Sequence, residues 1–314
     1  INNGRTIKTS QRCFTALSGR DHPVRFQSFV DQISQHHSAN IYLHCTVTEI
    51  HADTTSKRIQ RIKALNYQHQ SYEFIPQHLI LATGGLENSR LLQHALAKET
   101  IPKHWLSDTL GRFFMGHIMH NAPNAASEAI SFHYKLQPET LRYYLDKTSN
   151  QQHGVFQLTK HYQRKNRLRN SLLSFKLNET GKTVDDQLFY PYFMVEQEPN
   201  PHSFVQLAEA DIEDQFGTPQ LQLNWQLTQN DLTALPETIK HYQNELESQQ
   251  IANLKVRIEL DEITQNIETA RHHMGTTRIG VSIKEGVVDR NLKVHGLENL
   301  FVTGTSVFPT SGIA

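Results

Sequence analysis

A short apolar segment that ends in two adjacent glycines places the strongest constraint on the fold of this chain. Residues 75–85 read Ile-Pro-Gln-His-Leu-Ile-Leu-Ala-Thr-Gly-Gly, and the helix-forming segment 86–97 follows at once. A buried strand, a glycine turn and a helix make a βα unit of a parallel sheet. Residues 299–309 mirror this pattern, with a second apolar run that turns at Gly304. The sequence therefore predicts an α/β lobe.

Other segments predict a small sheet beside this unit and a second, larger sheet. Residues 42–47 and 59–67 are predicted strands, joined across the polar stretch 51–58. From about residue 110 to 268 the sequence changes to aromatic-rich strands with polar loops, which predict a mostly antiparallel sheet. Its strands are expected at residues 131–136, 154–158, 171–177, 190–196, 203–208 and 220–225.

Two helices are predicted outside the βα unit. Residues 25–37 have apolar side chains three and four apart, which is helical spacing. Residues 231–251 form the longer predicted helix, in which Pro236 is tolerable only in the first turn or so. Its apolar face consists of Leu235, Ile239, Tyr242 and Leu246. This face is expected to cover one side of the larger sheet.

Charge and composition exclude several kinds of partner. The chain has 31 basic and 31 acidic residues, and this balance argues against nucleic acid or an anionic membrane. No apolar run approaches the ~20 residues that a transmembrane helix needs. Cys13 and Cys45 have no metal-ligand spacing and are interpreted as free buried thiols. The protein is expected to be soluble, in the cytoplasm or the periplasm.

The glycines limit which cofactor this chain binds by itself. None of the 15 glycines lies in a G-x-G-x-x-G pattern, the main dinucleotide fingerprint. Either no dinucleotide binds, or its main site lies on residues outside this sequence. The chain opens at Ile1 without an initiator Met and stops at Ala314 soon after an apolar run, so it is expected to be a piece of a longer protein.

Four ordered motifs near the C-terminus resemble one enzyme family. They read HHMGTTRIG at 272–280, GVVD at 286–289, VHGLENLFV at 294–302 and SVFP at 306–309. Together they closely resemble the C-terminal signature of the glucose-methanol-choline (GMC) flavoprotein oxidoreductases. Further segments are similar to the family's second flavin-contacting unit, its crossing into the substrate domain and its substrate-domain sheet: 79–92, 111–117, and 196–201 with Asn224, Trp225 and Asp231.

The resemblance implies a fold and a division into domains. It implies an α/β fold, with an incomplete FAD-binding Rossmann-like lobe and an α+β substrate lobe whose mostly antiparallel sheet is capped by helices. Residues 1–109 are the expected partial FAD-binding lobe, 110–268 the substrate-binding domain, and 269–314 the return to the FAD-binding lobe with the catalytic motif. The Thr276-Thr277-Arg278 variant is more similar to bacterial sugar and polyol dehydrogenases or pyranose-oxidase-like branches than to choline or aryl-alcohol oxidases.

The resemblance also implies FAD-dependent oxidation of the CH–OH group of an alcohol, with a sugar or polyol as the expected substrate. Hydride transfer to flavin N5 needs a group that takes the hydroxyl proton, and imidazole suits this at neutral pH. The family places that base at the His of H-x-x-G-T, which here is His272. Its second active-site residue, an Asn or His, is expected beyond Ala314, so the chain alone is expected to be inactive. The expected electron acceptor is oxygen, a quinone or a protein partner.

The FAD contacts implied by the resemblance lie on three segments. A strand near the adenine carries Val47, and the first glycine turn supplies residues near the pyrophosphate or adenosine. The second glycine turn lies near the ribityl chain and the isoalloxazine. The expected contacts are Val47, Thr83, Gly84, Glu87, Gly304, Thr305 and Phe308.

The remaining candidates are interpreted as structural. His117 and His120 have an H-x-x-H spacing that could hold a metal on a helix, but no third ligand is near, so no metal is expected. Glu196 and Glu198 alternate on a predicted strand, so both could point to one face as paired carboxylates. An exposed strand face is the commoner place for such residues, and they are interpreted in this way. Met274 and Trp225 are expected in the core, and His273 is expected to pack beside the base or to contact the substrate. Four further histidines are expected in solvated helix ends and loops: His36, His37, His202 and His295.

A second hypothesis is non-enzymatic. In it the chain keeps the second half of the fold as a flavin-free binding or interaction module. The two hypotheses differ in whether coding sequence continues before Ile1 and past Ala314.

Overall fold

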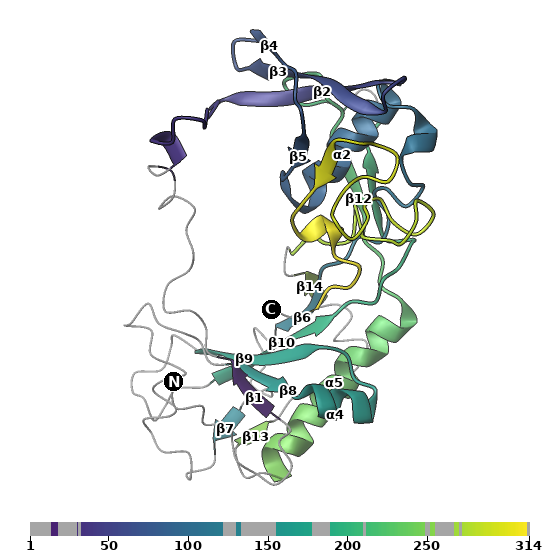
Figure 1. The fold of residues 1–314 in the computed structure, drawn as a ribbon. Helices are drawn as coiled ribbons and strands as arrows, with labels where there is room; N and C mark the ends of the chain where they lie inside the picture. Colours follow the sequence, from purple (N-terminus) through teal and green to yellow (C-terminus); the bar gives the residue numbers. More distant parts are fainter. Residues whose placement is uncertain are drawn as a thin grey trace.

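The structure is a computed structural model that describes residues 14–17, 30, 33–121, 130–132, 155–177, 189–209, 212–248, 252–254, 267–269 and 272–312. It has a mixed α/β fold with two lobes, one above the other in Figure 1. Two separate hydrophobic cores correspond to these lobes. The buried residues of the upper core lie at 50–106 and 287–307, on either side of those of the lower core at 118–254, whereas residues 14–17 belong to the lower sheet.

The upper lobe contains the two predicted glycine-turn units. Strands β5 (Leu79–Leu81) and β15 (Leu300–Val302) pair in parallel, so the two turns that follow them lie at the same edge. Helix α2 (Gly84–Ala97) follows β5, and the 3-10 helix η2 (Thr305–Val307) follows β15. The prediction of two matching units is confirmed, and α2 begins at Gly84, earlier than the expected residue 86.

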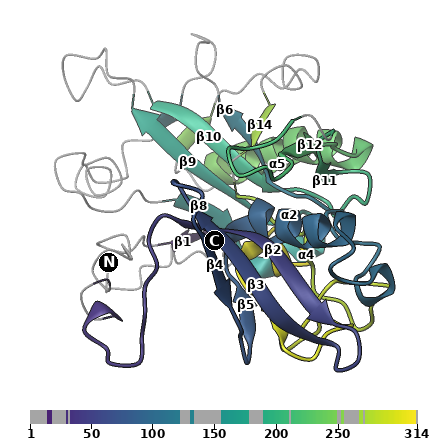
Figure 2. The same cartoon turned by 90° about the horizontal axis from the view of Figure 1, so that it is seen from above.

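A three-stranded antiparallel sheet packs beside this pair (Figure 2). It consists of β2 (Cys45–Asp53), β3 (Arg58–Asn66) and β4 (Ser71–Phe74). The expected strand at 42–47 is therefore wrong in its bounds, because β2 starts at Cys45 and continues to Asp53, three residues into the stretch predicted as a polar connection. Ile50 and Ile62 are paired across the two strands and buried, which explains this extension.

One buried amide joins this sheet to the parallel pair. Asn299 is fully buried just before β15, and its side chain bonds to both the N–H and the C=O of Ile59, at 2.6 and 2.9 Å. Its Nδ2 also donates to the carbonyl of Gln77, at 3.1 Å. A buried amide with these partners fixes the register between segments far apart in the chain.

The lower lobe is an eight-stranded antiparallel sheet. The main path runs β1-β8-β9-β10-β6-β14, while β7 pairs with β10 and with β13. The strands are β1 (Phe14–Leu17), β6 (His117–Asn121), β7 (Ile130–Phe132), β8 (Val155–Leu158), β9 (Ser171–Leu177), β10 (Phe189–Glu196), β13 (Ala252–Leu254) and β14 (Ile267–Thr269). The predicted strands at 154–158, 171–177 and 190–196 are confirmed within one residue at either end.

Helix α5 (Gln229–Ser248) covers one face of this sheet, as expected. Its four predicted apolar residues are fully buried, and the Tyr242 hydroxyl donates to the Ser171 carbonyl, at 3.1 Å. A reciprocal cap begins the helix, because Asp231 N–H donates to Thr228 Oγ1 and Thr228 N–H donates to Asp231 Oδ2. Pro236 lies in the second turn of a continuous helix, so its predicted confinement to the start is wrong.

The hairpin of β11 (Phe204–Leu207) and β12 (Leu221–Asn224) packs on α2 of the upper lobe (Figure 2). Gln93 on α2 donates to the Val205 carbonyl and accepts from Leu207 N–H. Arg90 forms an ion pair with Asp214, at 2.6 Å, and donates to the Thr218 carbonyl. The helix is thereby clamped between this hairpin and the β2 sheet.

Several expectations concern segments that the structure describes only in part. Of the helix predicted at 25–37 it describes Val30 and residues 33–37, and Cys13 and residues 133–136 lie outside the described residues. Cys45 is a free, half-buried thiol. Short helices η1 (Lys103–Trp105) and α4 (Lys160–Asn166) were not predicted. In the described part of the chain, no helix has the length and apolar character needed to cross a membrane.

Candidate active site

The motif that contains His272 is held by a segment more than one hundred residues earlier. Met115 and Met274 exchange two backbone hydrogen bonds of 3.0 Å, and Gly111 N–H donates to the Thr276 carbonyl, at 2.8 Å. The two segments predicted as the crossing and as the H-x-x-G-T motif therefore form one paired structure. His272 and His117 lie just beyond this pairing, one on each segment.

Glycine is required where these segments touch. Gly275 has φ +89°, and a Cβ there would clash with the Phe113 carbonyl. Phe113 is itself held under the Arg278 guanidinium, which lies 4.2 Å from the ring centroid. Burial lowers the pKa of Arg278. Arg278 also lines a pocket of about 780 Å³, whose other charged residues are Lys284, Glu285, Asp289 and Arg290. The stacking keeps Phe113 against Gly275.

The backbone after His272 lies between the two glycine turns. Thr305 Oγ1 donates to the His273 carbonyl, at 2.7 Å, and a Cβ on Gly85 would clash with the same carbonyl. Thr276 Oγ1 donates to the Gly85 carbonyl, at 2.5 Å. The motif is therefore in direct contact with the first turn of α2 on one side and with η2 on the other.

Asn88 joins the two turns from inside. This side chain is fully buried on α2, where its Oδ1 accepts from Thr83 N–H and Thr83 Oγ1, at 2.9 and 2.8 Å. Its Nδ2 donates to the Thr303 carbonyl and to Ser306 Oγ, both at 2.9 Å. Thr277 Oγ1 donates to the same Ser306 Oγ, at 2.7 Å. Five residues from three segments thus share one hydrogen-bond network.

Both turns leave space where a ligand could approach. Gly84 and Gly304 have φ of +95° and +101°, conformations that favour glycine, and a Cβ built on either has no neighbour within 4 Å. Each glycine lies at the start of a helix, and free N–H groups at helix starts favour anions and polar oxygens. The geometry therefore fits a cofactor that carries phosphate and hydroxyl groups.

The imidazole of His272 is exposed and contacts that of His117. The two Nδ1 atoms are 3.0 Å apart, and the rings meet edge to face with centroids 5.1 Å apart. His117 is buried, and its Nε2 lies 2.7 Å from the Gly312 carbonyl oxygen. His117 begins a β-strand, so the idea that its H-x-x-H pattern lies on a helix is wrong. In the described part of the chain, no three His, Cys, Asp or Glu residues cluster in a way that could hold a metal.

Burial controls the charge on the neighbouring imidazoles. It is the largest cause that lowers the pKa of His117, and the electrostatic interaction with His272 lowers it further. Burial also lowers the pKa of His273, whose ring lies 5.6 Å from that of Phe114. Both neighbours of His272 are therefore held neutral around pH 7.

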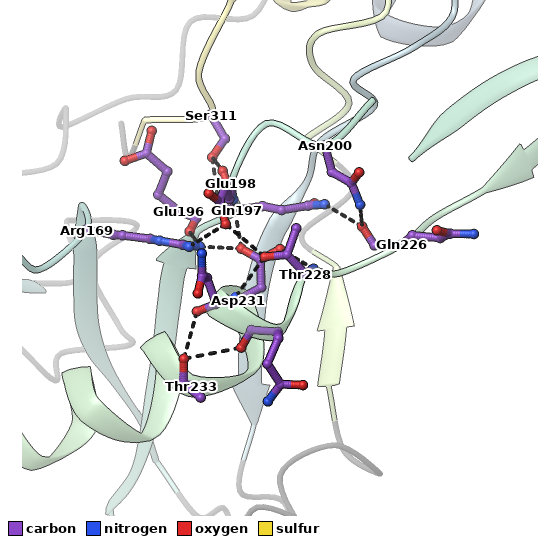
Figure 3. A network of polar contacts seen from close by, with 12 residues as sticks. Arg169, Glu196, Gln197, Glu198, Asn200, Gln226, Thr228, Asp231, Thr233 and Ser311 are labelled. Carbon is purple, nitrogen blue, oxygen red and sulfur yellow. Dashed lines mark hydrogen bonds and ion pairs between the residues drawn. The ribbon is translucent and has the colours of Figure 1, made fainter. Parts of the chain in front are cut away.

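A polar network fixes the C-terminal segment against the end of β10 (Figure 3). Glu196 Oε1 accepts from Gly312 N–H at 3.0 Å, and the Gln197 backbone bonds in both directions with Ser311 Oγ. Glu198 instead pairs with Arg169, at 3.1 Å, and Arg169 also pairs with the buried Asp231. The two glutamates do not act as paired carboxylates, and neither lies on a bare strand face.

Gln197 is the centre of this network. It is fully buried, and its Oε1 accepts from Gly116 N–H and from Trp225 Nε1, at 3.0 and 2.9 Å. Trp225 is half-buried with its indole N–H bonded, so its expected place in the core is wrong, whereas Met274 lies in the core as expected. Gln197 links the start of β6, the segment after β12 and Ser311.

The predicted cofactor residues occupy different environments. Gly84, Thr83, Gly304 and Thr305 lie on the two turns that Asn88 joins, and Phe308 is 47% exposed just after η2. Glu87 pairs with Arg90, at 3.2 Å. Val47 is half-buried on β2 and packs against the upper core, in a different sheet from the turns.

The other histidines are less uniform than expected. His36, His37 and His202 are exposed, as predicted. His295 is half-buried and its Nε2 lies 3.1 Å from the Gly280 carbonyl oxygen, so it is not a free solvated residue.

Three comparisons place these features among known proteins. Residues 199–314 match the model of the GMC oxidoreductase family. The search of curated proteins found no match. Similar solved structures include formate oxidase from Aspergillus oryzae RIB40 (16% identity, TM-score 0.57, covering 88% of this chain and 58% of that one). A pyridoxine 4-oxidase from Mesorbium loti is similar as well (16% identity, TM-score 0.54, covering 86% and 53%).

A third similar structure is an FAD-dependent oxidoreductase from Chaetomium thermophilum (11% identity, TM-score 0.61, covering 91% and 60%). At these identities the likeness concerns the fold. The chain spans between 53% and 60% of the length of these three structures. The expected resemblance of the C-terminal motifs is confirmed over residues 199–314.

Proposed function

We propose, from the premise that residues 199–314 are a GMC oxidoreductase domain, that this chain serves an FAD-dependent oxidoreductase acting on the CH–OH group of an alcohol. In this proposal the chain supplies the base, part of the flavin site and the substrate lobe. The neighbouring structures named as oxidases of formate and pyridoxine support a small-molecule substrate.

One observation carries the proposal. The loop of His272 is fixed directly between two glycine turns that are open to solvent and stand at the starts of two helices. A group bound along these turns would lie beside an exposed imidazole. This is the juxtaposition that oxidation of an alcohol requires, because a proton acceptor must stand next to a hydride acceptor.

The two turns fit FAD in shape and in polarity. Gly84 and Gly304 allow close approach of the backbone, and the N–H groups that follow can bind pyrophosphate or ribityl oxygens. Thr83, Glu87, Thr305 and Phe308 would line the same edge, and Val47 would contribute from β2. When bound, FAD supplies the acceptor for the hydride.

His272 would take the hydroxyl proton of the substrate. Its imidazole is exposed, while its neighbours His117 and His273 stay neutral. Neither of these two neighbours therefore places a positive charge against the imidazolium that would form. A general base of this kind contributes about 10²–10⁴-fold to a rate.

The substrate and the division of labour belong to the same proposal. A sugar or polyol is the proposed substrate, and the electrons would pass to oxygen, a quinone or a protein partner. Residues 269–314 and most of 1–109 would contribute to the flavin lobe and 110–268 to the substrate lobe. Strand β1 (Phe14–Leu17) departs from this division, because it pairs with β8 of the larger sheet. The second active-site residue would lie beyond Ala314.

The test is a visible absorbance spectrum of this chain and of the complete natural protein, each purified with added FAD. Bound flavin that an alcohol bleaches anaerobically is the expected result for the complete protein. His272→Ala should keep the flavin and lose the bleaching, whereas His202→Ala, a change at an exposed loop histidine, should keep both.

The same measurement addresses the non-enzymatic alternative. A well-folded complete protein that takes up no flavin would overturn the oxidoreductase proposal and favour a binding module. Flavin that bleaches equally in the His272→Ala protein would retain the oxidoreductase and remove His272 as its base.

A further inference from the structure

The hydrogen positions on His117 follow from its partners. A backbone carbonyl oxygen can only accept, so the 2.7 Å contact between His117 Nε2 and the Gly312 oxygen requires the hydrogen to be on Nε2. A neutral imidazole carries one hydrogen, so His117 Nδ1 has a lone pair. The atom that faces it at 3.0 Å, Nδ1 of His272, must then be the donor.

The position of the Gly312 carbonyl is itself fixed. Gly312 N–H donates to Glu196 Oε1, at 3.0 Å, and the preceding Ser311 is bonded through Oγ to the Gln197 backbone in both directions. Gly312 has φ +53°, a conformation that favours glycine. The carbonyl that orients His117 is thus held from both sides by the end of β10.

His117 also has to stay neutral for this argument to hold, because an imidazolium would present a second N–H to His272. Its side chain is 4% exposed, and burial lowers its pKa. The charged or titratable groups that act on it are His272, which opposes its protonation, and Glu196, which favours it. Burial is the largest of these effects.

We propose that His117 is a positioning residue that fixes His272 in the tautomer with the hydrogen on Nδ1 and a free lone pair on Nε2. The chain of contacts runs from Glu196 to Gly312, then to His117, and finally to His272. The tautomer is a property of this chain's own residues. Its use as a base rests on the proposed function.

The consequence for the reaction is a defined site of proton uptake. As the substrate O–H bond breaks, its proton would form a bond with His272 Nε2, while the hydride leaves the carbinol carbon for the flavin of the proposed function. His272 Nδ1–H continues to donate to His117 Nδ1 in the imidazolium. A neutral acceptor on that side stabilises the cation, because hydrogen bonds to charged groups are the stronger ones.

The first test needs no variant of His117. In the complete natural protein labelled with ¹⁵N-histidine, the two ring nitrogens of His272 are identified by comparison with His272→Ala. The expected result at pH 8 is a protonated-type shift for Nδ1 and an unprotonated-type shift for Nε2. The opposite assignment would overturn the proposal, whether or not the protein oxidises alcohols.

The second test changes His117. His117→Leu removes the acceptor, and the ring of His272 should then populate both tautomers, with kcat about 10- to 100-fold lower and KM little changed. His117→Asn places an amide oxygen near the former Nδ1 and should restore part of the tautomer bias and of kcat. Retention of the native tautomer in His117→Leu would also overturn the proposal.

The outcomes separate two kinds of failure. A native tautomer without any alcohol oxidation leaves the positioning role intact and removes the proposed function. Alcohol oxidation with the hydrogen on His272 Nε2 leaves the function intact and removes the positioning role.

Discussion

Asn88 Nδ2 lies 2.9 Å from Ser306 Oγ, so a single side chain on α2 reaches the second glycine turn, 218 residues further along the chain. The same side chain holds Thr83 on the first turn. Both of its donors and its acceptor are used, and none of the side chain is exposed. The separation between the two turns therefore depends on this amide.

We predict that Asn88→Asp lowers the free energy of unfolding by about 3 kcal/mol. The change keeps the acceptor for Thr83 but removes both donors and places a buried charge beside the Thr303 carbonyl. Urea unfolding measures it. Asn291→Asp makes the same chemical change at an exposed loop position and should cost less than about 0.5 kcal/mol. Equal losses in the two variants would contradict the role of Asn88.

We predict different effects at two glycines that share a positive φ. Gly304→Ala should cost about 1–3 kcal/mol from backbone strain alone, because its Cβ would point into open space. Gly275→Ala should cost several kcal/mol more, because its Cβ would clash with the Phe113 carbonyl. In the complete natural protein, titration with FAD should show that folded Gly304→Ala binds the flavin at least tenfold more weakly than the unchanged protein does. Unchanged binding would place the flavin away from this turn.

We predict that Asp231→Ala lowers the free energy of unfolding by about 2–4 kcal/mol. The variant loses the cap of α5 and leaves Arg169, which is 21% exposed, without its buried partner. Asp231→Asn retains one acceptor for the cap and should lose less. Thermal unfolding compares the two, and a larger loss for Asn than for Ala would contradict this explanation.

We predict that His94 makes the protein sensitive to acid. Burial is the main cause that lowers its pKa, and its buried Nδ1 has no hydrogen-bond partner among the residues that the structure describes. Because the unfolded chain binds the proton more readily, stability is full above about pH 6.5 and falls as the pH drops below that value. His94→Leu removes the proton site and should show a shallower fall.

The measurement for His94 is the urea midpoint at pH 8 and at pH 5.5. Burial lowers the pKa of His117 and of His273 as well, so the variant should keep part of the acid sensitivity. The same pH dependence in both proteins would contradict a neutral buried His94.

The parts of the fold with clear local signals were predictable. Strand β9 runs over the predicted residues 171–177, and the buried face of α5 consists of the four residues read from the helical spacing. Strand β6 had no such signal, because His-Ile-Met-His-Asn does not alternate. Its extended form comes from pairing with β10 on one side and β14 on the other.

The supports of the candidate site were mostly missed. Asn88 offered one signal, since an Asn inside a predicted helix is unfavourable unless its side chain has partners. Gln197 and His117 offered none, because their roles depend on contacts with Trp225 and Gly312 that only the folded chain creates. The sequence motifs indicated which residues are expected to contact substrate or flavin. They did not indicate which other residues hold those contact residues in place.

The parallel pairing of β5 with β15 has a consequence for the order of folding. The two strands are residues 79–81 and 300–302, and closing the long loop between them is entropically costly. The larger sheet and α2 can therefore form before the two turns meet. We expect the amides of Leu79 and Thr303, which bond across this pair to Asn299 and Leu81, to exchange with deuterium together and sooner than those of β9 and β10. The site would then be the last region to assemble and the first to open.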